Sequence, residues 1–271
     1  MELILLGTLQ QEWADKDVFA HVQQLEGEVI RDKEGRQTLK FSCAGKNYYR
    51  KLHTGIGWRE IAKNFSQVKM PVFGAANEWQ AINRVKQLGL DTLNAVAYGK
   101  RGGNPARQLS FLITEELTDT LSLAVYAERW PHQPISLREK RALIAKVADI
   151  ARTIHRAGIN HRDLYICHFL LDQSGAALHN KLQPGLFLVD LHRAQIRSKV
   201  PGRWLVKDLA SIYFSSLDIG LTRRDVLWFL KNYFDEPLRD TLRSRRRLLA
   251  SVTHRAIKLY KRDFGRLPRL P

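Results

Sequence analysis

The stretch from His161 to Asp172, HRDLYICHFLLD, decides which fold we expect, and it places Asp163 in a turn directly after an amphipathic helix. About 27 residues further on, the apolar run FLVD ends in Asp190. A turn that displays one carboxylate, followed by a strand that delivers a second, is how one class of phosphoryl-transfer enzyme holds a catalytic base and a Mg²⁺ ligand around a nucleotide. The spacing therefore predicts phosphoryl transfer.

Composition limits the class of protein and the kind of partner. The chain has 271 residues, 44% of them apolar, which suits one two-lobed enzyme with a sizeable core. Its net charge of +17 favours an anionic partner, such as nucleic acid, an acidic protein or a phosphate-bearing membrane face.

Residues 238–271 carry eleven Lys and Arg against two Asp, a net +9. Aromatic residues are not interleaved with these arginines as single-strand binding requires, so nucleic acid is disfavoured. Either a solvated helix face or, preferably, attraction to an anionic membrane or lipid substrate explains the run.

Cysteine usage and the N-terminus indicate the compartment. Cys43 and Cys167 are too few and too far apart for a zinc motif or a disulfide framework, which favours a reducing environment. The N-terminal apolar run is shorter than a signal-peptide core, and no segment approaches the length of a membrane span. We expect a cytoplasmic protein that at most lies on a membrane surface.

The first part of the chain reads as a β-rich lobe. A short helix over residues 15–25, with Asp15 as its N-cap, precedes three strands in residues 27–53, and the third strand carries Lys51. An amphipathic helix from Asn77 stops at Gly89 and has Glu78 in its first turn. Two further strands, at 94–99 and 108–115, would complete a five-stranded sheet.

The rest of the chain reads as mostly helical. Ser136 and Glu139 form a capping box for a helix that ends near Gly158, and Thr222 and Asp225 open another. A buried helix is expected in KDLASIYFSSLDIG, residues 207–220. We therefore expect an α+β protein with a two-lobed protein-kinase-like fold, with a β-rich N-lobe at 1–117 and a mainly helical C-lobe with a basic tail at 118–271. MgATP would bind in the cleft between the lobes.

Four residues occur in the order that this chemistry needs. Lys51 would contact the α- and β-phosphates, and Glu78 would hold its ammonium group in place. Asp163 would orient the attacking hydroxyl and accept its proton late, and Asp190 would bind Mg²⁺. Each residue alone has an ordinary explanation, such as a turn cap or a surface ion pair, and only their joint order favours catalysis.

Three histidines near the two acids invite a rival interpretation. His161, His168 and His192 could form a His/Asp metal centre for hydrolysis or oxidation. No HExxH or similar helical pair supports this, and histidines in turns more often hydrogen-bond the backbone.

Longer strings resemble one family closely: HRDLYICHFLL, FLVDLHRAQ, GIGWREIAKNF, GAANEWQAI and KDLASIYFSSLDIGLTRRD. Over nearly the whole chain they resemble the lipopolysaccharide core heptose kinases of Gram-negative bacteria, the WaaP (RfaP) group. The resemblance implies a phosphotransferase with an alcohol group as acceptor, which uses ATP and Mg²⁺ to phosphorylate the first inner-core heptose at O4. Its acceptor would be heptosyl-Kdo-lipid A at the cytoplasmic face of the inner membrane, where the enzyme would be peripheral.

The resemblance also implies roles for individual residues. Asp163 becomes the catalytic base, Asp190 the Mg²⁺ ligand, and Lys51 with Glu78 the phosphate-gripping pair. The adenine hinge would span residues 114–117, with Glu115, Glu116 and Leu117. Asp208 would be the buried acid that supports the turn of His161, Arg162 and Asp163. Candidate sugar-binding residues are Arg193, Arg59 and Lys63.

Several features depart from ordinary protein kinases. No GxGxxG lies between the first strands, and no APE segment lies downstream. His168 stands where such kinases place the second Mg²⁺-binding asparagine, so it is a candidate nucleotide or metal contact, and Leu191 and His192 replace Phe-Gly.

The alternative functions are a small-molecule kinase of the aminoglycoside or choline type and a non-catalytic basic adaptor on the same fold. An acidic protein, such as a carrier in lipid synthesis, could shield part of the basic surface.

Overall fold

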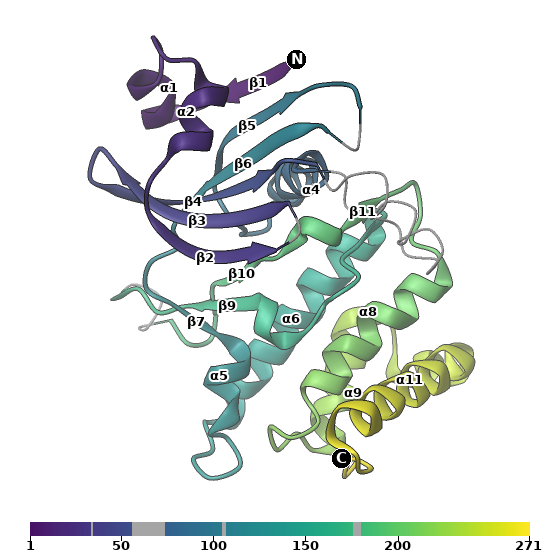
Figure 1. Ribbon diagram of the computed structural model, residues 1–271. Coiled ribbons are helices and arrows are strands. Elements are labelled where there is room, and N and C mark those ends of the chain that lie inside the picture. Colours follow the sequence, from purple (N-terminus) through teal and green to yellow (C-terminus); the bar gives the residue numbers. More distant parts are fainter. Residues whose placement is uncertain (34, 56–73, 105–106, 176–179) are drawn as a thin grey trace. The chain divides into compact units, whose positions relative to one another are not determined.

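The computed structural model describes all residues except 34, 56–73, 105–106 and 176–179 (Figure 1). The chain forms two compact units. The first comprises Met1–Arg84, Leu93–Thr118 and Leu191–Arg193, and the second comprises Val85–Thr92, Asp119–Asp190 and Ala194–Pro271. The boundary near residue 117 stays a prediction for the limits of the folding domains.

An antiparallel sheet forms the frame of the first unit (Figure 1). Its strands lie in the order β1-β5-β6-β4-β3-β2. Their bounds are β1 Glu2–Leu5, β2 Glu28–Lys33, β3 Arg36–Cys43, β4 Lys46–His53, β5 Ala95–Arg101 and β6 Leu109–Glu115. The three-stranded meander is confirmed, but the five-stranded sheet was wrong by one strand. The edge strand β1 pairs with β5, Glu2 opposite Lys100, and such a distant partner leaves no local pattern.

Two short helices, α1 at Gly7–Glu12 and α2 at Val18–Gln24, share a core with this sheet. The N-cap of α2 is Asp17, not the predicted Asp15, because the Asp17 carboxylate accepts from the N–H groups of Phe19 and Ala20. Close packing explains one glycine: a Cβ at Gly99 would lie 2.3 Å from the Phe111 ring. The core residues include Leu9, Trp13, Phe19, Val22, Phe41, Tyr48, Phe111 and Ile113.

Helix α4, Ala76–Gln87, follows the segment that is not described and brings Glu78 to the sheet. Its Trp79 ring stacks on Tyr98 of β5, with the centroids 5.5 Å apart and the planes inclined by 17°. The predicted helix from Asn77 with Glu78 in its first turn is therefore confirmed.

The second unit is mostly helical, as predicted. Its helices are α5 Leu123–Glu128, α6 Leu137–Arg156, α8 Gly202–Ser215, α9 Arg223–Phe234, α10 Leu238–Ser244 and α11 Arg246–Phe264. Short strands accompany them: β7 Thr120–Ser122, β8 Ile159–Asn160, β9 Phe169–Asp172, β10 Leu186–Leu188 and β11 Gln195–Ile196. The capping box of Thr222 and Asp225 is present at α9. At α6, Ser136 caps the Glu139 N–H, but the Glu139 carboxylate accepts from the Tyr126 hydroxyl, so the reciprocal half of the box is missing from the described contacts.

The basic tail forms the helices α10 and α11. Val252, Ala256 and Tyr260 are buried on one face of α11, which packs against α8. Helix α11 is therefore amphipathic and has a structural face, and the basic side chains of the tail are exposed. Among the described residues, no helix has the length and hydropathy needed to cross a bilayer.

Candidate active site

The residues that precede Asp163 determine the position of the turn that carries it. Helix α6 ends at Arg156, and Gly158 then adopts φ 78°, which L residues with side chains rarely reach. A Cβ there would lie 1.8 Å from the backbone oxygen of Arg197, so only glycine fits. Strand β8 follows and pairs with β11, Asn160 opposite Gln195, and this pairing delivers His161–Asp163 directly after a fixed strand.

A buried carboxylate supports the turn. Asp208 of α8 is fully buried and accepts from the backbone N–H groups of His161, at 2.7 Å, and Arg162, at 2.8 Å. The Nε2 atom of His155 lies 3.3 Å from the same carboxylate, and the other ring nitrogen of His155 lies 2.8 Å from the hydroxyl of Tyr233. Asp208 therefore holds two backbone groups of the turn, and its role in catalysis stays a prediction.

Two residues next to the expected chemistry have left-handed backbones. Arg162 has φ 76° and Asp190 has φ 62°. Such conformations cost on the order of 1 kcal/mol or more in residues with side chains and cluster at functional sites. The Arg162 guanidinium lies over the Trp204 ring of α8 at 5.0 Å, which stabilises a buried cation in this turn.

His161 connects the turn to the strand before Asp190. Burial lowers the pKa of its ring, so the imidazole is neutral, and Nε2–H donates to the Val189 carbonyl at 3.0 Å. Its ring stacks on that of His168, with the centroids 5.7 Å apart. His161 therefore has a supporting position, in keeping with the role expected for it.

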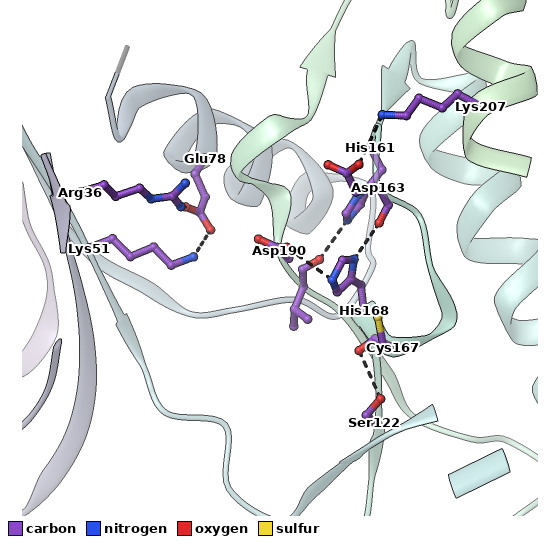
Figure 2. A network of polar contacts seen from close by, with 11 residues as sticks. Arg36, Lys51, Glu78, Ser122, His161, Asp163, Cys167, His168, Asp190 and Lys207 are labelled. Carbon is purple, nitrogen blue, oxygen red and sulfur yellow. Dashed lines mark hydrogen bonds and ion pairs between the residues drawn. The ribbon is translucent and has the colours of Figure 1, made fainter. Parts of the chain in front are cut away.

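The Asp163 carboxylate lies beside a lysine that the sequence analysis did not single out. The Nζ atom of Lys207 is 3.3 Å from Oδ1 of Asp163, and both side chains are mostly buried (Figure 2). The only available signal was the position of Lys207 immediately before Asp208.

His168 lies between Asp163 and Asp190 (Figure 2). Its Nδ1 is 2.7 Å from the Asp163 carbonyl oxygen, and its Nε2 is 3.4 Å from Oδ2 of Asp190. Burial alone would lower the pKa of His168, but the Cys167 side chain, the Asp163 carbonyl and the Asp190 charge together raise it to about 9. His168 therefore contacts both the Asp163 turn and the Asp190 carboxylate, and its expected role as a nucleotide or metal contact stays a prediction.

The Asp190 carboxylate suits Mg²⁺. Mg²⁺ prefers oxygen ligands and is commonly held by one or two carboxylates together with water and phosphate oxygens. The Asp190 carboxylate is 35% exposed, so it can reach such an ion. No cluster of three or more His, Cys, Asp or Glu side chains that could hold a metal ion occurs in the part of the chain that the structure describes.

The first unit carries the predicted lysine–glutamate pair. Lys51 lies on β4, and its Nζ is 2.5 Å from Oε1 of Glu78 on α4 (Figure 2). Glu78 is only 2% exposed, and Arg36 lies 4.0 Å from its second oxygen. A nearly buried carboxylate with two cations around it holds the lysine ammonium in one position, as a phosphate contact requires.

The predicted hinge residues are engaged within the sheet. The Glu116 carboxylate accepts from Lys40 at 2.5 Å, Asn47 at 2.8 Å and Tyr49 at 3.1 Å, and the hydrogen bond from Lys40, followed by that from Asn47, lowers its pKa. Glu115 accepts from the side chain of Asn94. Both glutamates thus tie the end of β6 to neighbouring strands, and the adenine contact of residues 115–117 stays a prediction.

The candidate sugar-binding residues are resolved only in part. Arg193 lies in the 3₁₀ turn Leu191–Arg193, which belongs to the first unit. In that unit Asn77 donates to the His192 carbonyl at 2.9 Å, a contact that the sequence analysis missed. Arg59 and Lys63 lie outside the described residues.

Comparison with known proteins gives consistent matches. The family model described as the lipopolysaccharide kinase (Kdo/WaaP) family matches residues 20–233. The lipopolysaccharide core heptose(I) kinase WaaP of Pseudomonas aeruginosa is 50% identical over 262 residues, which is 97% of either chain. The protein of the same description from Escherichia coli K12 is 48% identical over 92% of this chain and 94% of its own. A solved structure of WaaP in complex with acyl carrier protein superposes with a TM-score of 0.84, at 45% identity, over 96% of this chain and all of that one.

Proposed function

The chain belongs to the lipopolysaccharide kinase (Kdo/WaaP) family, and from this premise we propose that it transfers the γ-phosphate of ATP to the first inner-core heptose of lipopolysaccharide. The observation that carries the proposal is the 50% identity to a core heptose(I) kinase over 97% of both chains. Identity at this level over nearly the full length of both chains favours a common acceptor as well as a common fold. The phosphorylated hydroxyl is proposed to be O4.

The residues of the second unit would perform the transfer. The acceptor oxygen forms a bond to the γ-phosphorus, and the bond from phosphorus to the bridging oxygen breaks, with its electron pair leaving on ADP. The Asp163 carboxylate accepts the hydroxyl proton. The turn that carries Asp163 is held in place by the buried Asp208. Asp190 would bind Mg²⁺, which supplies positive charge to the phosphate oxygens. In the first unit, Lys51 and Glu78 would hold the α- and β-phosphates.

The charge of the chain suits the proposed acceptor and its location. Kdo carboxylates and lipid A phosphates form an anionic surface, and each basic residue close to such a surface adds about 1 kcal/mol of attraction. With a net charge of +17, the protein would be peripheral on the cytoplasmic face of the inner membrane. Acyl carrier protein, the partner of the solved relative, is proposed as a partner here, since an acidic protein complements the same basic surface.

The experiment follows γ-phosphate transfer from MgATP to heptose-containing lipopolysaccharide that lacks core phosphate. Asp163→Asn should lower kcat by orders of magnitude, since loss of a general base alone removes about 10²–10⁴-fold. Asp149→Asn is the matched control, because Asp149 is a 44% exposed partner of Arg152 on α6. Transfer to aminoglycosides or choline in place of the heptose acceptor would select the small-molecule kinase. Nucleotide binding without transfer to any acceptor would select the adaptor.

A further inference from the structure

Phosphoryl transfer needs positive charge beside the transferred group. Negative charge spreads over the three equatorial oxygens of that group, and enzymes stabilise it with Lys, Arg or metal ions aimed at that position. The basic side chains of the turn have other contacts: the Arg162 guanidinium lies over the Trp204 ring at 5.0 Å, and the His168 ring contacts the Asp163 carbonyl and the Asp190 carboxylate. A side chain from another element can add positive charge beside the base.

Helix α8 delivers such a side chain. Its residues 207 and 208 are adjacent, and both reach the turn: Asp208 accepts from two backbone N–H groups of the turn, and Lys207 contacts the Asp163 carboxylate. The two buried hydrogen bonds of Asp208 fix the register of α8 on the turn. The same bonds therefore fix the distance at which Lys207 approaches Asp163.

The lysine is further positioned by an aromatic ring. Trp204 lies one helical turn earlier on α8, and Nζ of Lys207 is 5.8 Å from the ring centroid. The side chain is only 16% exposed, so its charge acts in a poorly solvated site where electrostatic interactions are strong. Holding a lysine here costs side-chain entropy and desolvation free energy. An uncharged side chain could pack against Trp204 without the desolvation cost.

Lys207 has more donors than its contact with Asp163 uses. An ammonium group has three N–H donors, and Nζ lies 3.3 Å from Oδ1 of Asp163. A phosphoryl oxygen placed beside the base would therefore lie within reach of the same ammonium group.

We propose that Lys207 is a catalytic residue whose ammonium group contacts the transferred phosphoryl group beside Asp163. The inference rests on the proposed phosphoryl transfer and adds a cation beside the base. Lys207 keeps its protons throughout: the hydroxyl proton passes to Asp163, and the ammonium group stabilises the charge on the phosphoryl oxygens as the bond to ADP breaks.

The test uses substitutions that separate charge from packing. Lys207→Met keeps the apolar stem on Trp204 and removes the charge, and Lys207→Arg keeps the charge with a different geometry. The matched control is Lys231→Met, because Lys231 of α9 lies over Trp228 at 5.5 Å, again three residues after a tryptophan, outside the site. Each protein is assayed for transfer to the heptose acceptor and for slow hydrolysis of MgATP by water, with melting temperatures as a check on folding.

We expect Lys207→Met to lower kcat in both reactions by on the order of 10²–10³, with little change in the KM for ATP, and Lys207→Arg to recover part of the loss. The control should match the unmutated protein. If Lys207→Met keeps the kcat of the control in both reactions, the inference is overturned and the lysine only packs on Trp204. If the unmutated protein hydrolyses ATP but does not phosphorylate the heptose acceptor, the proposed function fails, and the hydrolysis rates still decide the role of Lys207.

Discussion

Replacing Asp208 by Asn tests whether one buried carboxylate organises the turn of Asp163. The aspartate accepts from the backbone N–H groups of His161 and Arg162 through different oxygens. An asparagine keeps one oxygen and points an NH₂ group at the other N–H. A buried donor without an acceptor costs about 1–3 kcal/mol, and the remaining bond loses its charge assistance, so we expect a total loss of about 2–4 kcal/mol.

Two measurements check this prediction. Urea unfolding gives the free energy of unfolding, and hydrogen exchange of the turn gives the protection of the two backbone amides. Protection should fall at both amides, and kcat should fall with it, because the left-handed Arg162 loses the contact that holds it. Asp149→Asn on α6 is the control and should cost less than about 1 kcal/mol, as expected for an exposed ion pair. Unchanged stability and unchanged amide protection in Asp208→Asn would refute the reasoning.

Three further predictions concern the first unit. Glu78→Gln removes the buried partner of Lys51 and should lower kcat/KM for ATP by roughly 10–100-fold in transfer assays, because the ammonium group loses its fixed position. Burial, and after it the neighbouring cations, lowers the pKa of His53 to about 3 in the folded protein. As the pH falls below about 6.5, this histidine therefore binds a proton in the unfolded chain but not in the folded one. This linkage should remove about 2 kcal/mol of stability between pH 7 and pH 5, and His53→Gln should abolish that share in urea titrations. Gly99→Ala places a methyl group against the Phe111 ring and should cost about 1–3 kcal/mol in thermal unfolding.

Each of these changes has a matched control and a result that contradicts it. Glu12→Gln on the exposed side of α1 should leave ATP kinetics unchanged, and equal kinetics for Glu78→Gln would contradict the assigned ion pair. His132 is exposed, so the His132→Gln variant should lose as much stability between pH 7 and pH 5 as the unmutated protein. The His53 prediction is wrong if His53→Gln loses that same amount. A Cβ at Gly103 would have no heavy atom within 4 Å, and Gly99→Ala should be clearly less stable than Gly103→Ala.

Local patterns predicted the elements that local forces determine. The apolar stripe after Ser136 predicted α6, and the Thr222–Asp225 box predicted α9, because capping and amphipathicity act within a few residues. The Lys51–Glu78 pair was predicted as well, since it depends on one strand and one helix whose patterns are clear.

Features that depend on distant partners were not visible in the sequence. The edge strand β1 forms because residues near Tyr98 present an open edge. Lys207 reaches Asp163 only because α8 packs beneath the turn. The second half of the Ser136 capping box was lost to Tyr126, a tertiary partner that competes for Glu139. The supporting role of the basic tail arises from the packing of Tyr260 and its neighbours against α8, whereas its charge pattern suggested only a surface.

The most direct test of the central claim is the position of the new phosphate in the reaction product. The unmutated protein is incubated with MgATP and heptosyl-Kdo-lipid A, and the product is analysed by mass spectrometry and by correlation of ³¹P with sugar protons in NMR spectra. We predict one added phosphate, on O4 of the first heptose, with ADP formed in equal amount. An acceptor to which no phosphate is added while ATP binds, or a new phosphate on Kdo or lipid A, would contradict the account.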